Sequence, residues 1–176
     1  TVGVTIVDQS GQTVAQHEQP LHYSPRWRQR EYPLDTITLQ HPQLWSCESP
    51  YLYTAIVTIY NRPHQPLDQV SQSFGVRTIA FSPQYGLRIN GKKVLLKGFA
   101  NHHTLGALGA AAYPRAIEKR LQLMKSFGYN HVRTAHNPYS EEFPNLCDKY
   151  GIIVVNELYD KWLQQFAGGQ IGRAHV

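Results

Sequence analysis

The chain has 176 residues, 41% of them apolar and 16% charged, and its formal net charge is +5. This length suits one domain or two small ones, and the composition is that of a globular protein rather than a disordered one. No apolar run approaches the ~20 residues that span a bilayer, so we expect no membrane association. The two cysteines, Cys47 and Cys147, are too far apart to predict a zinc knuckle or a disulfide framework.

The N-terminal part of the chain has the pattern of an all-β domain. Strands are expected at residues 2–6, 13–17, 36–40, 51–60 and 69–81. β-branched and aromatic residues dominate these runs, and proline-containing clusters separate them. Short strands at this spacing, with no helical period, predict an antiparallel β-sandwich over residues 1–82.

After residue 82 the pattern changes to strands that alternate with helices. Asn90-Gly91 predicts the tight turn of a hairpin over residues 87–96. Further strands are expected at 94–99, 130–134 and 152–155, and helices at 114–127 and 140–150. This β-α-β-α-β order predicts a parallel sheet covered by helices.

The two predicted helices have clear boundaries. Pro114 suits the first turn of the first helix, and Gly128 ends it. The apolar stripe of that helix consists of Ile117, Leu121 and Met124. The second helix begins with acidic residues, which its positive N-terminal end favours, and it stops at Gly151.

Polar side chains follow each of the three predicted parallel strands. They comprise Asn101, His102 and His103 after the first strand, Arg133 to Tyr139 after the second, and Asn156, Glu157, Tyr159, Asp160 and Trp162 after the third. Because ligands bind at the carboxyl ends of parallel strands, these side chains predict a binding site. This set of side chains suits a hydroxyl-rich substrate, because its planar donors and acceptors can bind hydroxyl groups and its rings can pack on sugar faces. A glycine-rich phosphate loop is absent from the sequence.

Each of these residues also has a structural interpretation. His102 and His103 are adjacent, so only one of them can point into a site from an extended backbone. Arg133 also suits a structural ion pair, and Glu157 also suits the cap of a following helix. His136 precedes Asn-Pro, and from its position alone a loop cap is favoured. A metal site built from His102, His136 and Glu157 is disfavoured because the spacing is diffuse.

Residues 26–30, Arg-Trp-Arg-Gln-Arg, interleave bases with a ring as nucleic-acid-binding patches do. No nucleic-acid-binding fold surrounds them in the sequence pattern. A solvated strand face is therefore favoured, and we expect no nucleic-acid partner.

Two longer stretches resemble a known family signature. They are residues 130–138, Asn-His-Val-Arg-Thr-Ala-His-Asn-Pro, and residues 146–157, which end in Val-Val-Asn-Glu. The resemblance is to glycoside hydrolase family two, the β-galactosidase and β-glucuronidase family. It continues upstream through Leu44-Trp-Ser46, Pro50-Tyr-Leu-Tyr53, Phe74-Gly-Val-Arg77, Asn90-Gly91 and Leu96-Lys-Gly98.

The resemblance implies an architecture and a reaction. It implies an immunoglobulin-like sandwich over 1–82, followed over 83–169 by the first three β/α units of an incomplete TIM barrel. Relatives are retaining hydrolases of terminal β-linked sugars, in which two carboxyl groups ~5 Å apart act as acid/base and nucleophile. These two glutamates follow the fourth and seventh barrel strands of the family. We therefore expect neither in this chain, and no activity from the chain alone.

The resemblance also implies roles for individual residues in binding a β-linked glycoside, most simply a β-galactoside. Arg133 matches an arginine that holds the nucleophile ionised, and His136 matches a histidine that contacts the sugar. His102 aligns with a histidine of the pocket wall. Asn137 and Glu157 complete the expected substrate-binding or supporting set, with no catalytic residue and no metal ligand among them.

The sequence departs from the commoner family pattern at three positions. Ala100 replaces an amide, His103 an acidic residue, and Asn156 a frequent aspartate. These departures leave open the sugar preference and the magnesium site that galactosidase-type relatives imply for a full-length protein. A non-catalytic carbohydrate-binding or structural β module is the alternative function, although the polar ends of the parallel strands favour the hydrolase.

The two ends of the chain carry their own expectations. Residues 171–176 follow Gly168-Gly169 and fit no element. They could be encoded by a nucleotide sequence that resembles a widely used sequencing adapter. We therefore expect an artefactual tail over 170–176 on a truncated gene fragment. A periplasmic, secreted or cytoplasmic location stays open, as does a homo-oligomer when the protein is full length.

Overall fold

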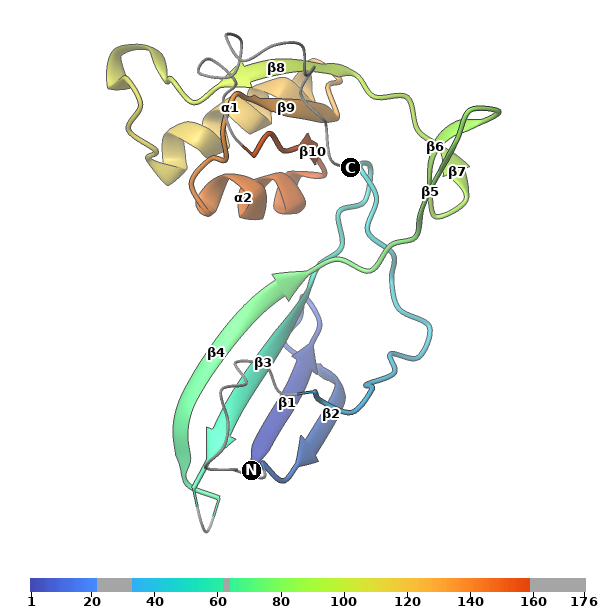
Figure 1. Ribbon diagram of the computed structural model, residues 1–176, viewed down its shortest axis with the longest axis vertical. Coiled ribbons are helices and arrows are strands. Elements are labelled where there is room, and N and C mark those ends of the chain that lie inside the picture. The colour runs from blue at the N-terminus through green and yellow to red at the C-terminus, as the bar shows by residue number, and fades with distance from the viewer. Residues whose placement is uncertain (22–32, 62–63, 159–176) are drawn as a thin grey trace, which may run out of the picture. The chain divides into compact units, whose positions relative to one another are not determined.

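The structure is a computed structural model that describes residues 1–21, 33–61 and 64–158. The chain forms two compact units, one of residues 1–44 and 51–76, the other of residues 45–50 and 77 onward. Figure 1 shows the ribbon. The predictions for residues 26–30, for Tyr159, Asp160 and Trp162, and for the tail at 170–176 lie outside the described residues.

The first unit contains one antiparallel sheet. Its strands are β1 (Val2–Val7), β2 (Thr13–Gln19), β3 (Tyr53–Tyr60) and β4 (Pro66–Phe74). Their order is β2-β1-β3-β4 (Figure 1). Val4 lies opposite Val57 in the central pair. Val4, Ile6 and Tyr53 form the buried core of this sheet. The strands expected near residues 2, 13 and 51 are thus confirmed.

Two strand predictions in this part of the chain are wrong. Residues 36–40 form no strand, although Ile37 and Leu39 pack against the core of the sheet. Their apolar alternation therefore reflects burial of side chains without backbone pairing. The single strand expected at 69–81 is two strands, β4 and β5 (Ile79–Ser82), because β4 pairs with β3 whereas β5 pairs with β6 (Gly86–Ile89) in the second unit.

A small three-stranded sheet opens the second unit. Its order is β5-β6-β7, where β7 is Lys92–Lys93. Asn90 and Gly91 have φ angles of 52° and 75°, as the tight turn between β6 and β7 requires. The predicted hairpin is therefore confirmed.

The parallel sheet consists of β8 (Gly98–His102), β9 (His131–Ala135) and β10 (Ile153–Val155), in the order β10-β9-β8. Its first strand begins later than the prediction of 94–99. The residues before β8 are instead bonded to the Asn130 side chain, whose Oδ1 accepts a hydrogen bond from Lys97 N and whose Nδ2 donates to Leu95 O. The Lys97 carbonyl also accepts from Asn130 N and His131 N, so this segment runs beside the start of β9 without being part of the strand.

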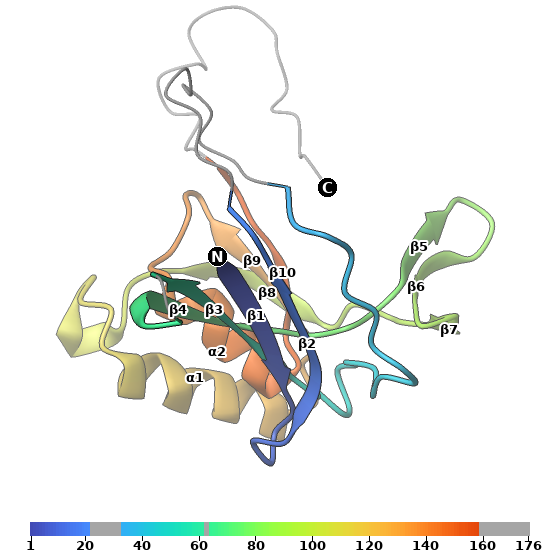
Figure 2. The ribbon, with the colours of Figure 1, turned by 90° about the horizontal axis from the view of Figure 1, so that it is seen from below.

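Two helices cover one face of the parallel sheet. They are α1 (Pro114–Ser126) and α2 (Glu142–Tyr150), and a short 3-10 turn, η1 (Gly106–Leu108), precedes α1. Figure 2 shows both helices on the same side of the strands. The buried core between helices and sheet contains Ile117, Leu121, Met124, Val132, Phe143, Cys147 and Ile152. The predicted helices and apolar stripe are confirmed. No helix within the described residues is long and apolar enough to cross a membrane.

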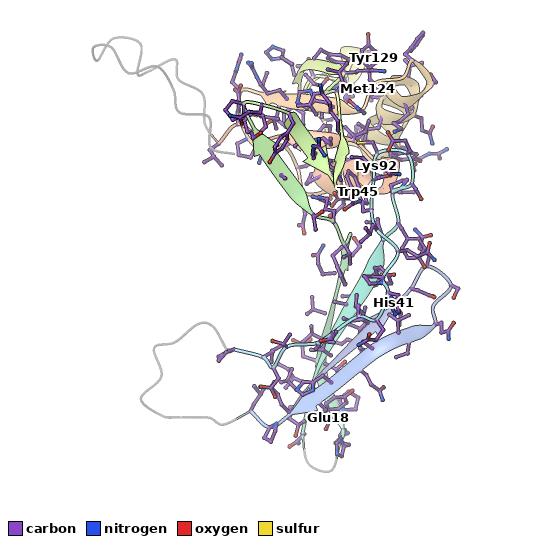
Figure 3. The ribbon with its side chains drawn as sticks, turned by 90° about the vertical axis from the view of Figure 1, so that its right-hand side faces the viewer. Glu18, His41, Trp45, Lys92, Met124 and Tyr129 are labelled. Atoms are coloured by element: carbon purple, nitrogen blue, oxygen red, sulfur yellow. The ribbon has the colours of Figure 1, made fainter. Side chains whose placement is uncertain are left out.

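Residues 45–50 pack in the second unit although they lie between two strands of the first unit in the sequence. Trp45, labelled in Figure 3, is 1% exposed, and its indole Nε1 donates to Asp148 O over 2.8 Å. The Cys47 carbonyl accepts a hydrogen bond of 2.8 Å from Lys125 Nζ. The 45–50 segment is thereby attached to α1 and to the C-terminal end of α2.

Candidate functional site

The three parallel strands end at one edge of the sheet. His102 lies opposite Ala135 in the β8–β9 pair, and Val155 lies opposite Arg133 in the β9–β10 pair. The polar residues that follow each strand are therefore brought together, as the sequence predicts. Four of the five predicted site residues contact one another, and the fifth, Asn137, is partly buried and forms no side-chain hydrogen bond within the described residues.

Glu157 is the centre of this cluster. Its Oε1 lies 2.6 Å from Arg133 Nε, and its Oε2 lies 2.8 Å from His136 Nδ1. The Glu157 side chain is 27% exposed, so the bridge is screened by water only in part. Because both carboxylate oxygens are engaged, Glu157 acts as a bridge that orients the guanidinium and the imidazole.

A buried threonine fixes the backbone that carries Glu157. Thr134 is 1% exposed, and its Oγ1 donates to Asn156 Oδ1 and accepts from Glu157 N, both over 2.9 Å. This role of Thr134 was not predicted from the sequence. The sequence offers one local signal for it: Thr134 places a hydroxyl on the same face of the strand as Val132, which is fully buried.

The two adjacent histidines have different neighbours. The His102 ring lies edge-on to His136, with ring centroids 5.4 Å apart and planes at 84°. The His103 ring instead contacts Tyr139, with centroids 6.0 Å apart. The two rings thus have different partners, and of the two it is His102 that contacts His136.

Tyr139 links the end of β8 to the loop that follows β9. Its hydroxyl donates to the Asn101 carbonyl, and its ring packs on Phe143 with centroids 4.7 Å apart. Burial raises the pKa of Tyr139, so this hydroxyl keeps its proton at neutral pH. Tyr139 is thus a structural donor. The peptide bond between Ala135 and His136, at the start of this loop, is cis.

A small hollow lies next to this link rather than at Glu157. It is lined by His103, Leu105, Ala112, Ile117, Arg120, Tyr139, Ser140 and Phe143. Arg133, His136 and Glu157 do not line it, and their side chains are 44%, 36% and 27% exposed. Within the described ranges, no three His, Cys, Asp or Glu side chains gather in a way that could hold a metal ion. The magnesium expectation therefore rests on the family resemblance alone.

The fold and the cluster together define a class of protein. An antiparallel β unit precedes a parallel α/β sheet whose polar residues gather at the carboxyl ends of the strands, as in the catalytic domains of α/β barrel enzymes. The family model described as "Glycosyl hydrolases family 2" matches residues 1–77. The one described as "Glycosyl hydrolases family 2, TIM barrel domain" matches residues 84–166. The chain belongs to glycosyl hydrolase family 2.

Curated relatives carry two activities in their names. The chain is 41% identical over 126 residues to the β-galactosidase BoGH2A of Bacteroides ovatus, a match that covers 72% of the chain and 15% of the relative. It is 31% identical over 159 residues to a putative β-glucuronidase of Formosa agariphila, covering 90% of the chain and 15% of the relative. The chain thus spans about 15% of the length of these relatives.

Solved structures agree with this assignment. A glycosyl hydrolase family 2 member from Bacteroides cellulosilyticus superposes with a TM-score of 0.82 at 36% identity, over 89% of this chain and 21% of that one. A β-glucuronidase from Ruminococcus gnavus in complex with D-glucuronic acid superposes with a TM-score of 0.74 at 25% identity, over 89% of this chain and 25% of that one. Family membership is therefore supported by sequence and by fold.

Proposed function

We propose that this chain is part of a retaining glycoside hydrolase that removes terminal β-linked sugars, most simply β-galactosides. In this proposal the first unit belongs to an immunoglobulin-like sandwich, and β8, β9 and β10 are the first three strands of a TIM barrel. The observation that carries it is the Glu157 bridge between Arg133 and His136 at the carboxyl edge of the sheet. The galactoside preference is supported by the name of the Bacteroides ovatus relative.

The bridge suits the binding of a sugar in several ways. Glu157 holds the His136 ring through Nδ1, which leaves the opposite ring nitrogen, Nε2, free to bond a sugar hydroxyl. Among the described residues, the other two guanidinium nitrogens of Arg133 have no hydrogen-bond partner, so they can hold an anionic group such as a catalytic carboxylate. His102, edge-on to His136, extends this surface as a wall of the subsite.

The two catalytic carboxyl groups of the proposed reaction lie outside this chain. In a retaining hydrolase one carboxyl protonates the departing oxygen, while the other attacks the anomeric carbon and forms a glycosyl-enzyme that water then cleaves. Glu157 fills neither role, because both of its oxygens are already bonded to cationic or hydrogen-donating partners. The residues of this chain therefore bind and orient the sugar and the nucleophile.

A second candidate function has its own support. The relative from Formosa agariphila and the solved structure from Ruminococcus gnavus are both called β-glucuronidases. A non-catalytic carbohydrate-binding or structural β module is the remaining alternative, and it predicts no turnover by any protein that carries this sequence. The homo-oligomer expected of a full-length enzyme stays a prediction.

The experiment is an activity measurement on the complete protein that carries this sequence. Chromogenic aryl β-galactosides and β-glucuronides are compared, and we expect the galactoside to be cleaved with the higher kcat/KM. His136→Ala should lower kcat/KM about a hundredfold, the usual cost of removing one hydrogen-bonding group that acts in the transition state. His17→Ala, in β2 of the first unit, is the control and should leave the rate unchanged.

Two results would contradict the proposal. An unchanged rate for His136→Ala removes His136 from the sugar site. Turnover of either substrate by the purified 176-residue chain alone means that the catalytic carboxyl groups are within it after all. Sequence of the complete gene provides a further check, since an Asn-Glu pair should follow a fourth strand and another Glu a seventh.

A further inference from the structure

Arg120 is a polar residue of α1 whose side chain reaches the end of the neighbouring strand β8. Its Nη1 donates to Asn101 Oδ1 and to His102 O, both over 3.0 Å. Its Nη2 donates to the Thr104 carbonyl. One guanidinium thus binds three oxygen atoms along the segment that leaves the sheet next to the polar cluster.

Removing the charged Arg120 guanidinium from water without an ion-pair partner costs free energy. All three acceptors are neutral, and among the described residues no carboxylate forms an ion pair with Arg120. Burial lowers the pKa of Arg120, yet a guanidinium remains charged at any physiological pH. A leucine at this position would extend the buried stripe of Ile117 and Leu121 without removing a charge from water. Compared with a leucine, Arg120 gives up apolar packing and gains hydrogen bonds to the end of β8.

The bonds of Arg120 act on the residues that carry His102. Asn101 is 6% exposed, and it is held by Arg120 through its side chain and by the Tyr139 hydroxyl through its carbonyl. His102 follows directly, with its own carbonyl bonded to Arg120. Its ring meets His136, which is in turn bonded to Glu157. A continuous set of contacts thus runs from α1 to the sugar-facing edge.

We infer that Arg120 is a positioning residue, which fixes the backbone at His102 so that the His102 ring lies against His136 on the wall of the sugar subsite. This inference rests on the proposed function of that edge. Lysine cannot replace Arg120 fully. Its ammonium group donates from a single nitrogen, whereas the planar guanidinium donates from two separate nitrogens to the three acceptors. Arg120 itself does not touch the sugar.

The test compares variants of the complete protein. Arg120→Lys keeps the charge and Arg120→Met keeps the length of the side chain, and Arg115→Met is the matched control. Arg115 is exposed on the same helix and forms no side-chain hydrogen bond within the described residues. The measurements are kcat and KM on the aryl glycoside that the wild type cleaves best, thermal unfolding, and crystal structures of the variants.

We expect both Arg120 variants to lose about tenfold to hundredfold in kcat, because a displacement of about 1 Å at a binding group costs rates of that order. Arg120→Lys should unfold within about 3 °C of the wild type, and Arg115→Met should match the wild type in both rate and stability. The crystal structures should show the His102 ring displaced from His136. A purely structural role would lower the unfolding temperature and leave kcat of the folded enzyme unchanged.

Two results overturn the inference. One is an Arg120→Lys enzyme with the wild-type kcat and an unchanged His102–His136 ring pair. The other is failure of both variants to fold, which makes Arg120 a residue required for folding. If the wild type cleaves no glycoside, the proposed function fails, and the ring pair in the Arg120→Lys crystal structure alone decides whether Arg120 positions His102.

Discussion

Gly151 ends α2 in a position where two separate physical effects exclude a side chain. Its φ angle is +67°, the left-handed region that costs an L-residue about 1–2 kcal/mol. A Cβ atom built there would also lie 2.4 Å from the Cys47 carbonyl oxygen, well inside van der Waals contact. Gly151→Ala must therefore displace backbone of the 45–50 segment, which also binds Lys125 through the Cys47 carbonyl.

Gly128 provides a matched control at the end of the other helix. Its φ angle is +81°, but a Cβ atom there would meet nothing within 4 Å. Gly128→Ala should cost about 1 kcal/mol, since the alanine also reduces the entropy of the unfolded chain and so offsets part of the strain. Gly151→Ala should cost about 3 kcal/mol, because forcing atoms into a packed site adds about 1–3 kcal/mol to the same backbone term.

The assay is thermal unfolding of the 176-residue chain followed by circular dichroism at the helix band, since both α-helices within the described residues belong to the second unit. For a chain of this length about 1 kcal/mol corresponds to about 3 °C. We therefore expect Gly128→Ala to lower the Tm by about 3 °C and Gly151→Ala by about 9 °C. Equal losses in the two variants would refute the close packing of Cys47 on Gly151.

Two further substitutions test the packing and the charge of the second unit. Leu121 is 0% exposed, so Leu121→Ala should cost about 3 kcal/mol in urea unfolding, whereas Leu123→Ala, at 58% exposure on the same helix, should cost under about 0.5 kcal/mol. Burial raises the pKa of the Asp148 carboxyl above its ordinary 3.8, against the opposing effect of Arg77. The contribution of Asp148 to stability is therefore complete below pH 3.8, where the carboxyl is protonated, and is lost as the pH rises through the raised pKa. Asp148→Asn should therefore raise the Tm at pH 7 and leave it unchanged near pH 3, and a lower Tm at pH 7 would contradict this sign.

The parts of the fold that the sequence predicts well are those that local interactions determine. Pro114, the stripe around Leu121, and the two terminal glycines fix both helices within their own residues. Strand pairing depends on distant residues, and there the predictions were less successful. The start of β8 was misplaced because the apolar run from Val94 predicts a strand, whereas residues 95–97 are bonded to the side chain of Asn130, which lies just before β9.

The candidate site shows the same division. The cluster of His102, Arg133, His136 and Glu157 follows from the rule that parallel strands end at one edge. No comparable sequence rule predicts the residues that hold the cluster in place. Arg120 lies within a helix whose apolar stripe dominates its pattern, and only its three acceptors on the β8 segment reveal what it does.

A substitution at Thr134 can weaken the bridge that Glu157 forms with Arg133 and His136 without changing the packing of β9. Alternate residues of β9 face opposite sides of the sheet, so Val132 and Thr134 are buried at 0% and 1% exposure, whereas Arg133 is exposed. Thr134→Val replaces the hydroxyl by a methyl group of the same size, so the helix-facing side of the strand keeps its shape. It leaves the Glu157 amide without its acceptor, at a cost of about 1–3 kcal/mol.

We therefore expect Thr134→Val to lower the free energy of unfolding of the chain by about 2 kcal/mol, and Thr134→Ser, which keeps the hydroxyl, to lose less. In the complete protein, Thr134→Val should also reduce kcat/KM, because Glu157 then loses the anchor that directs it toward Arg133 and His136. Thr134→Ser should recover most of that rate. If Thr134→Val, which lacks the hydroxyl, keeps the wild-type rate, the hydrogen bonds of Thr134 do not hold the bridge in place.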